Sequence, residues 1–324
     1  MKPIVTFGEA LIDLLSTNSA TYAANPGGAP ANVAAAAALL GSTSYLIGKV
    51  GRDAFGDAVR RKLEEAGVRT HYLGVSPWKN TPLAVVSLSS EGNRDFAFYR
   101  TDTADLDFRP EEIPVRAFDG AIVFHFGSLT LTSEPCRSAT LHAAREAKRR
   151  GCLVSYDPNL RLRLWDSEAA ARERLLEAMD LADVVKINED ELLFLSEAPT
   201  DATRQLSLEE AAQALRERYR LKALLVTLGP EGCLSASDRG LERFAGVRAK
   251  AVDTTGAGDA FVGALLNGIA RALPDADRWA DLMAAPGLWE RIVRGAVAYS
   301  ALSTERYGAI DSYGSEVPAT TKGE

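Results

Sequence analysis

Residues 251–266 read AVDTTGAGDAFVGALL. A short apolar stretch leads into two threonines, two glycines and an acid, and then into a strongly apolar helical sequence. Gly256, Ala257 and Gly258 would present backbone N–H groups without bulky side chains where this helix begins. Because such N–H groups and the helix dipole attract anions, the segment predicts a site for a phosphate or for a phosphoryl group in transfer.

Asp259 follows this predicted anion site, and two roles are consistent with its position. It could cap the N-terminus of the helix, as acids commonly do. It could instead accept the proton of an attacking hydroxyl while the neighbouring N–H groups hold the phosphoryl group. We expect the positive end of the helix to keep Asp259 ionised and therefore a weak base, which acts late, as the hydroxyl acidifies on attacking phosphorus.

Two common phosphate-binding motifs are absent from the sequence. There is no G-x-x-x-x-G-K-[ST] loop, and no G-x-G-x-x-G follows a predicted strand. The sequence therefore supports neither a P-loop nor a dinucleotide-binding fold.

The composition is typical of a globular protein, with 46% hydrophobic and 25% charged residues in a chain of 324. This length allows one large α/β domain or two ordinary domains. Lys and Arg number 37 against 44 Asp and Glu, which gives a net charge of −7. Proteins that bind nucleic acids or anionic lipids usually carry a basic surface, so a small-molecule partner is favoured.

The cysteines and the N-terminus indicate where such a protein works. Cys136, Cys152 and Cys233 are odd in number and lack the paired spacing of a zinc site, so we expect reduced packing residues. The strand-like run IVTF occupies residues 4–7 without a signal-peptide pattern, and no stretch of about 20 apolar residues occurs. We expect a cytoplasmic protein that does not enter a membrane.

Strand-like apolar runs alternate with segments of helical spacing along most of the chain. The strand-like runs are residues 4–7, 44–51, 121–128, 152–158, 183–188 and 223–229, and the helix-like segments are residues 29–40, 55–66, 134–150, 167–179, 189–195 and 207–219. Because the strands read as continuous apolar runs, this order predicts an α/β fold with a mostly parallel central sheet and helices on both faces.

One segment interrupts the alternation with two extended runs, residues 82–101, which read as a hairpin. Phe96, Phe98 and Arg100 would share one of its faces. Since no helix follows to cover it, we expect the hairpin to project as a small β lid together with the extended stretch near Asp13. The predicted organisation is a single domain over residues 1–314, with lid strands from about 13–26 and 82–102, and a polar C-terminal tail over residues 315–324.

Several motifs together resemble the ribokinase-like (PfkB) carbohydrate kinases. AVDTTGAGDAFVGALL is similar to the C-terminal signature of that family, and GEALIDLL (8–15), PGGAPANVAAAAALLG (26–41) and GKVGRDAFG (48–56) are similar to its N-terminal signature. The resemblance runs from residue 8 to about residue 312 and implies a ribokinase-like fold. The stretches that most resemble the fructokinase group are FAFYRTDTADLDF (96–108), SYDPNLRLRLW (155–165), KINEDEL (186–192) and LVTLGPEGC (225–233).

Carried over by position, the resemblance implies that Asp13, Gly28 and Asn32 bind sugar hydroxyls. Asp13 can accept two hydroxyl hydrogen bonds, Asn32 can both donate and accept, and Gly28 lets the backbone approach the ligand. On the residues alone, Asn32 could also be a helix cap, and the glycine pair that includes Gly27 could be a plain turn.

Three further residues are implied on the sugar side. Arg161, in the DPNLR segment at the end of a strand, would contact the sugar or the transferring phosphate. Phe98 and Arg100 on the inner face of the lid would close over the sugar and exclude water. Simple packing within the lid is the alternative for Phe98.

The resemblance places the nucleotide and its metal at two other strand ends. Asn188 and Glu191 would bind Mg²⁺ and phosphate, with Glu191 acting through water because magnesium keeps several of its waters. A solvated helix charge is the alternative for Glu191. Thr227, Gly229 and Gly232 match the nucleotide-side loop, for which a turn that ends a strand is the alternative.

Some relatives also have a monovalent-cation loop, and the resemblance extends to its positions. A K⁺ ion would lie behind the anion-binding turn, held by Asp253, Thr255, the carbonyls of Ser303, Arg306 and Gly308, and the Ser312 hydroxyl.

The implied activity is that of an ATP-dependent sugar kinase, with fructose and fructose 6-phosphate as the leading substrate and product. Asp259 would activate a primary hydroxyl, and the amides of residues 256–258 with Mg²⁺ would stabilise the phosphoryl group. A kinase of 2-keto-3-deoxygluconate or of a riboside is the alternative, since Arg100 and Arg161 would suit an acidic sugar. A catalytically silent relative that binds sugar or nucleotide is the non-enzymatic alternative. Because a small hairpin sheet exposes its edges, we also expect a homodimer through the lid.

Overall fold

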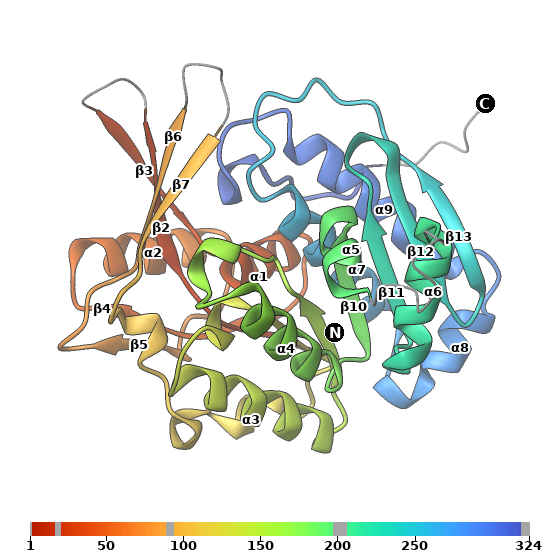
Figure 1. Ribbon diagram of the computed structural model, residues 1–324, viewed down its shortest axis with the longest axis horizontal. Coiled ribbons are helices and arrows are strands. Elements are labelled where there is room, and N and C mark those ends of the chain that lie inside the picture. The colour runs from red at the N-terminus through yellow and green to blue at the C-terminus, as the bar shows by residue number, and fades with distance from the viewer. Residues whose placement is uncertain (1, 17–20, 89–93, 197–205, 319–324) are drawn as a thin grey trace.

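The computed structural model describes residues 2–16, 21–88, 94–196 and 206–318. Its main sheet has nine strands in the order β13-β12-β11-β10-β9-β8-β1-β4-β5 and is parallel from β5 to β11 (Figure 1). These strands are β1 (Ile4–Phe7), β4 (Ser44–Gly51), β5 (Leu73–Ser76), β8 (Val123–Gly127), β9 (Leu153–Asp157), β10 (Val184–Asn188), β11 (Ala223–Thr227), β12 (Gly232–Ser237) and β13 (Gly240–Ala245).

Helices cover both faces of this sheet, and each face has its own hydrophobic core. One face carries α1 (Ala29–Leu39), α2 (Ala54–Glu65), α7 (Ala257–Ala272), α8 (Trp279–Ala284) and α9 (Leu288–Ser303). The other carries α3 (Cys136–Arg149), α4 (Glu168–Met179), α5 (Glu189–Leu195) and α6 (Leu208–Arg218). The predicted α/β fold is confirmed. Strands β8 and β9 are buried at every position, which is why they read as unbroken apolar runs.

Close packing of α1 against α7 sets the geometry of the site. The middle of α1 is a buried run of alanines, and α7 contributes a glycine at the contact. A Cβ at Gly263 would overlap the Cβ of Ala36 in α1 and crowd the carbonyl oxygen of Val33, so glycine allows the helices to approach this closely. The first turns of the two helices are therefore held side by side.

A second sheet of four strands, which we call the lid sheet, projects from the main body (Figure 1). It consists of β2 (Leu11–Ser16), β3 (Tyr22–Gly27), β6 (Leu83–Leu88) and β7 (Arg94–Tyr99) in the order β3-β2-β6-β7. Both predicted lid segments thus form strands, although residues 17–20 and 89–93 and the Phe96 side chain lie outside the described part of the chain. The hairpin β6–β7 is antiparallel, and β2 joins it in parallel to β6.

The beginning of the C-terminal tail lies next to α9. Gly314 accepts a hydrogen bond of 2.7 Å from the Tyr299 hydroxyl, and Val317 lies against Gly295 of α9. Val317 thus makes a contact with the body, while Ser315 and Glu316 beside it are exposed. Residues 319–324 lie outside the described residues.

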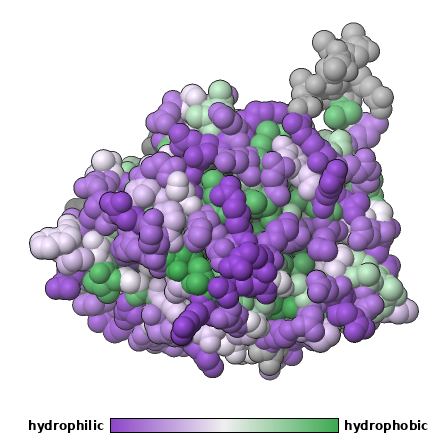
Figure 2. Space-filling view, turned by 90° about the horizontal axis from the view of Figure 1, so that it is seen from below, coloured by the Kyte–Doolittle hydropathy of each residue, from purple (hydrophilic) through white to green (hydrophobic). Residues whose placement is uncertain are grey.

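The surface is mixed in character. On the face shown in Figure 2, hydrophobic residues appear in small groups among hydrophilic side chains. All three cysteines are buried and unbonded to one another, as expected from their spacing. Within the described part of the chain, every helix is too short or too polar to span a lipid bilayer.

Candidate active site

A cavity of about 480 Å³ lies at the carboxyl ends of the central strands, beneath the lid sheet. Residues from the lid, from the main sheet and from α1 and α7 line it together. The sequence-predicted residues among its lining are Asp13, Gly28, Asn32, Phe98, Arg161, Asn188, Thr227, Gly229, Thr255, Gly256, Gly258 and Asp259. Residues far apart in the sequence are thus brought to one place, where open parallel sheets commonly bind ligands.

Asp259 lies in the first turn of α7 and is buried. The Asn32 side-chain amide donates a hydrogen bond of 2.8 Å to Asp259 Oδ2. The N-cap position of α7 is occupied by Gly256, and Asp259 lies three residues further on, within the helix. The carboxyl is therefore held toward the cavity by α1.

The protonation of Asp259 differs from the prediction. Burial raises the pKa of Asp259 from 3.8 to about 7, against the hydrogen bond from Asn32 and the positive charges of Lys186 and Arg161. We expected the helix N-terminus to keep the carboxyl ionised, which was wrong because the loss of hydration in a closed site outweighs the favourable charges. The group is therefore a much better base than an exposed aspartate.

The turn before α7 differs from the prediction at one of its three amides. Gly256 begins the helix in the left-handed region at φ 75°, and its carbonyl accepts a hydrogen bond from the buried Tyr313 hydroxyl at 2.8 Å. Gly256 and Gly258 line the cavity. The Ala257 amide instead donates to the Thr254 carbonyl at 3.2 Å, so this predicted anion-binding group is engaged within the turn.

The predicted sugar residues Asp13, Gly28 and Asn32 meet on one wall. A Cβ at Gly27 would lie 2.7 Å from Asp13 Oδ2, and a Cβ at Gly28 would lie 2.5 Å from the Glu9 carbonyl oxygen. Both glycines are thus needed for close approach, and the plain-turn alternative does not explain this crowding. Burial raises the pKa of Asp13 to about 6, while the positive charge of Arg161 lowers it.

The two lid residues of the prediction are placed differently. Phe98, at the end of β7, is half-buried and lines the cavity. Arg100 lies beyond β7 and does not line the cavity, although a sugar contact was predicted for it. It is buried in an ion pair with Asp105 at 2.6 Å, because a guanidinium at this depth requires a compensating carboxylate. It therefore adds no uncompensated positive charge for an acidic sugar.

Asn188 and Glu191 form a capping box at the start of α5. The Glu191 amide donates to Asn188 Oδ1 at 2.8 Å, and the Asn188 amide donates to Glu191 Oε2 at 2.9 Å. Glu191 Oε1 accepts from the Leu160 amide at 2.7 Å. Glu191 is buried, so the alternative of a solvated helix charge was wrong, and burial raises its pKa. Asn188 lines the cavity, whereas Glu191 lies behind it.

A neighbouring cavity of about 360 Å³ has mostly apolar walls, which include Pro230, Val247, Phe261 and Val297. The predicted nucleotide residues Thr227, Gly229 and Gly232 line it. The residues shared by both cavities are Thr227, Gly229, Thr254 and Gly258. A ligand in one cavity can thus meet a ligand in the other at the turn before α7.

The predicted cation loop is partly assembled around Asp253. This buried carboxylate accepts hydrogen bonds from the Thr255 amide at 2.8 Å and from the Gly308 amide at 3.0 Å. The Ser303 and Ser312 side chains are buried and donate to the carbonyls of Ser300 and Ala309, whereas Arg306 is exposed. No cluster of three or more His, Cys, Asp or Glu side chains suited to a metal ion occurs within the described ranges.

Lys186, Asp157 and Glu9 belong to the site but were not predicted. Lys186 is buried in β10, donates to Asp157 Oδ2 at 3.1 Å, and its ammonium would lie 3.0 Å from a Cβ at Gly258. The sequence feature that could have identified Lys186 is its place within the apolar run DVVKIN, since lysines are rarely buried without a partner or function. Glu9 lines the cavity just after β1, where an acid follows the run IVTF.

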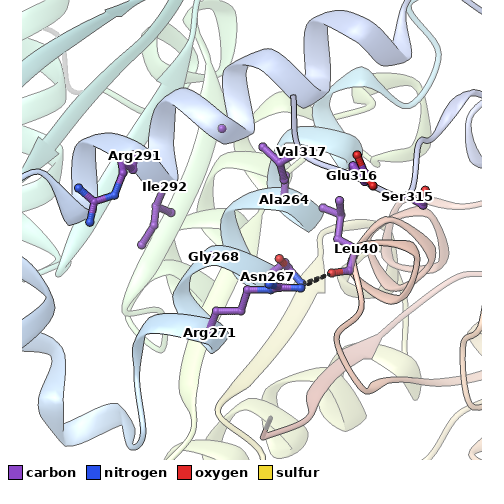
Figure 3. Close-up of a pocket in the computed structure, with 11 residues that line it drawn as sticks. Leu40, Ala264, Asn267, Gly268, Arg271, Arg291, Ile292, Ser315, Glu316 and Val317 are labelled. Carbon is purple, nitrogen blue, oxygen red and sulfur yellow. Dashed lines mark hydrogen bonds between the residues drawn. The ribbon is translucent and has the colours of Figure 1, made fainter. Parts of the chain in front are cut away.

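A further cavity of about 460 Å³ lies at the opposite end of α7, between α7, α9 and the tail (Figure 3). Asn267 on its floor donates to the Leu40 carbonyl at 3.1 Å, and Arg271 and Arg291 lie toward one side. No residue predicted for catalysis or binding lines it. This cavity is separate from the candidate active site.

Comparisons with known proteins establish the family and the fold of this chain. The model of the pfkB family carbohydrate kinases matches residues 1–315. A probable fructokinase-4 of Arabidopsis thaliana is 42% identical over 99% of this chain and 97% of its own length. The fructokinase of Xylella fastidiosa with bound ATP has a TM-score of 0.89 and 35% identity, covering 96% of this chain and 95% of that chain. A Vibrio cholerae fructokinase double mutant, in a form with bound fructose, ADP and potassium, has a TM-score of 0.85 and 34% identity, covering 96% and 95%. The chain is a member of the PfkB family of carbohydrate kinases and has the ribokinase-like fold.

Proposed function

We propose that this kinase transfers the γ-phosphoryl group of ATP to the primary 6-hydroxyl of fructose. The observation that carries the proposal is the placement of Asp259, which faces the sugar-side cavity one residue from Gly258, a residue shared with the nucleotide-side cavity. The substrate assignment is supported by the fructokinases among its relatives. Neither a riboside kinase nor a kinase of an acidic sugar is favoured, the latter because Asp105 compensates the charge of Arg100.

The reaction follows from the groups at this junction. Asp259 accepts the proton of the 6-hydroxyl as the hydroxyl oxygen forms its bond to the γ-phosphorus and the bond to the ADP oxygen breaks. The amide of Gly258 and the nearby Lys186 ammonium stabilise the negative charge of the transferring group. Phe98 and the lid sheet exclude water, which would otherwise compete as the acceptor.

The residues present fit a magnesium ion held through water. Asn188 and Glu191 offer an amide oxygen and a carboxylate, and each carboxylate oxygen can accept more hydrogen bonds than the one from the backbone. Mg²⁺ there would neutralise charge on the nucleotide phosphates. Asp253 with the Thr255 and Gly308 segment is the proposed place for K⁺, which would order the anion-binding turn from behind; the Vibrio cholerae relative with bound potassium supports this assignment.

The lid is the proposed dimer interface. Its strands leave edges at β3 and β7, and Tyr22 and Tyr99 are exposed at 47% and 64%. Edge strands with exposed aromatic residues are commonly covered by a second copy. Size-exclusion chromatography with light scattering is expected to give twice 34.7 kDa, and a monomer at assay concentration would exclude this interface. The cytoplasmic location stays a prediction.

An assay of ADP release over fructose, glucose, ribose, 2-keto-3-deoxygluconate and a nucleoside tests the substrate. We expect the highest kcat/KM with fructose, and phosphorus NMR of the product should show a 6-phosphate. Faster turnover of an acidic sugar or of a nucleoside would replace fructose as the substrate. Tight binding of ATP and fructose without any product would instead indicate a catalytically silent protein.

A further inference from the structure

The cavity at the far end of α7, which we call the distal cavity, has no role in the reaction described above. It measures about 460 Å³ and lies between α7, α9 and residues 315–317 (Figure 3). Ala264, Ile292 and Val317 contribute apolar surface to its walls. Because cavities of this size commonly hold small organic molecules, the polar groups of the lining decide which class of molecule fits.

Asn267 supplies a buried acceptor on the floor of the distal cavity (Figure 3). The residue is 4% exposed, and its amide nitrogen donates to the Leu40 carbonyl at 3.1 Å and to Ser42 Oγ at 2.8 Å. Since a carbonyl can only accept, the contact with Leu40 fixes which end of the amide is the nitrogen. No described residue donates to Asn267 Oδ1. Buried acceptors usually have a donor, and a ligand hydroxyl in the cavity would supply one.

Two arginines supply positive charge. Arg271 Nη2 donates to the Leu40 carbonyl at 3.0 Å, which leaves its other N–H groups unused, and Arg291 makes no hydrogen bond to any described residue. In the described part of the chain neither guanidinium forms an ion pair. Because guanidinium groups bind carboxylate and phosphate oxygens through several N–H donors, these side chains suit an oxyanion.

The remaining polar groups lie at the other end of the distal cavity. Figure 3 places Arg291 at one end, Glu316 and Ser315 at the other, and Asn267 and Arg271 on the floor. Glu316 is the one carboxylate of the lining, so the two arginines leave the lining with a net positive charge. A carboxylate and a hydroxyl at that end can bind hydroxyl groups of a ligand. The lining therefore fits a compact molecule with an oxyanion and hydroxyls, such as a sugar phosphate.

The chain segment that lines the distal cavity also holds the turn before α7. The Tyr313 hydroxyl donates to the Gly256 carbonyl at 2.8 Å, and the Tyr299 hydroxyl of α9 donates to the Gly314 carbonyl at 2.7 Å. Residues 315–317 follow directly and reach the cavity. A ligand that contacts residues 315–317 would therefore also restrict Tyr313, and with it the carbonyl of the residue that begins α7.

We propose that the distal cavity is an effector site for a small hydroxylated oxyanion. The anionic group binds Arg271 and Arg291, a hydroxyl donates to Asn267 Oδ1, and binding acts on the turn before α7 through residues 313–317. The binding of the effector is independent of the proposed substrate. Its effect on the nucleotide rests on the proposed reaction, in which that turn holds the transferring phosphoryl group.

Calorimetry with the full-length enzyme tests binding, with glucose 6-phosphate as the probe. ADP and fructose are present at saturating concentration, so that the active site is occupied and no turnover occurs. Arg271→Gln and Arg291→Gln are each expected to weaken binding about tenfold. Arg278→Gln, which removes the same charge from an exposed position just before α8, is the matched control and should bind as the wild type does.

Three further probes test the chemical class. Glucose, which lacks the anionic group, should not bind, and inorganic phosphate, which lacks the hydroxylated body, should bind about tenfold more weakly than glucose 6-phosphate. Gluconate that binds as tightly as glucose 6-phosphate would support the oxyanion class and identify a carboxylate as sufficient. Phosphate that binds as tightly as glucose 6-phosphate would contradict the role of Asn267 and of the hydroxyl groups.

Steady-state kinetics test the effect on the nucleotide. Glucose 6-phosphate is expected to lower KM for ATP at least about fivefold in the wild type and in Arg278→Gln, but not in Arg291→Gln. An equal change in all three enzymes would place the effect in the active site.

Other outcomes would overturn the effector site itself. Equal affinity of the wild type and both cavity variants for glucose 6-phosphate would show that the anion binds elsewhere, and no binding at all would reduce the distal cavity to a gap in the packing. Binding that the arginine variants weaken, without any change of KM for ATP, would refute the link through residues 313–317. If the sugar panel replaces fructose as the substrate, the proposed substrate fails, and the loss of binding in the arginine variants still identifies the distal cavity.

Discussion

The Asn32 side-chain amide and Asp259 Oδ2 are joined by a buried hydrogen bond of 2.8 Å. This bond connects the first turn of α1, which forms a wall of the sugar-side cavity, to the first turn of α7, where we propose that the phosphoryl group is held. Because the hydrogen bond is made to the ionised carboxylate, it opposes the effect of burial on the pKa of Asp259. The pKa of Asp259 thus stays near 7, where the carboxylate can take up a proton efficiently at neutral pH.

The pH dependence of the rate should follow from this balance. We expect kcat/KM for fructose to rise as Asp259 loses its proton and to reach a plateau above about pH 7. Asn32→Ala should move the rise to higher pH, because the carboxylate loses its hydrogen bond. Asp13, with a pKa of about 6, adds an earlier rise that Asp13→Asn removes. A profile that stays flat from about pH 5 to 9 would show that neither carboxyl limits the rate.

The same burial predicts that the base destabilises the fold at neutral pH. A carboxyl whose pKa rises on folding lowers the free energy of unfolding of the protein as the pH rises from the unfolded pKa, near 3.8, to the folded pKa, near 7. Asp259→Asn should therefore raise the free energy of unfolding at pH 8 by up to roughly 4 kcal/mol and leave it nearly unchanged at pH 4. Urea unfolding at both pH values measures this. Equal effects at the two pH values would contradict the raised pKa.

Gly28 should be intolerant of a side chain because of its surroundings and not only its backbone. Gly28 and Gly120 both have positive φ, at 107° and 73°, but a Cβ at Gly28 would meet the Glu9 carbonyl whereas one at Gly120 meets nothing within 4 Å. Gly28→Ala should raise KM for fructose at least about tenfold, and Gly120→Ala should cost only about 1 kcal/mol of stability. Steady-state kinetics and thermal unfolding compare them. Equal kinetics in both variants would remove Gly28 from the sugar wall.

Two variants should distinguish the contribution of Lys186 to stability from its contribution to the rate. Lys186→Met leaves Asp157 buried without its cation and should cost about 3–5 kcal/mol of stability. Adding Asp157→Asn should restore most of this stability, since the Asp157 carboxylate is then no longer buried without its cation. The rate should remain lower by about 10²–10³ if the ammonium stabilises the phosphoryl group. Recovery of the rate along with stability would assign Lys186 to the fold alone.

Much of the fold could be predicted because its strands and helices have clear local signals. Continuous apolar runs became β8 to β11, and the glycine-rich turn became the start of α7. That Gly256, Gly258 and Asn32 come to one cavity could also be predicted, because their types and order resemble the family signatures.

What could not be predicted depends on depth and on neighbours brought close by folding. The pKa of Asp259 depends on how completely the site is closed, which no local pattern encodes. In the alternation of β7, Arg100 would face the same side as Phe98, toward the cavity. However, β7 ends at Tyr99, and Arg100 forms a buried ion pair with Asp105 instead. Glu191 is buried because the Leu160 amide reaches it from another strand end.

The most direct measurement is the turnover of Asp259→Asn with fructose and ATP, followed by ADP release, with calorimetric binding of fructose to the same variant. We expect binding similar to the wild type and a rate lower by about 10²–10⁴, because the variant keeps an acceptor for Asn32 but cannot take up the proton of the hydroxyl. Asp281→Asn, a surface aspartate of α8, is the control and should be fully active. Near-normal turnover of Asp259→Asn would contradict the role of this carboxyl as the general base.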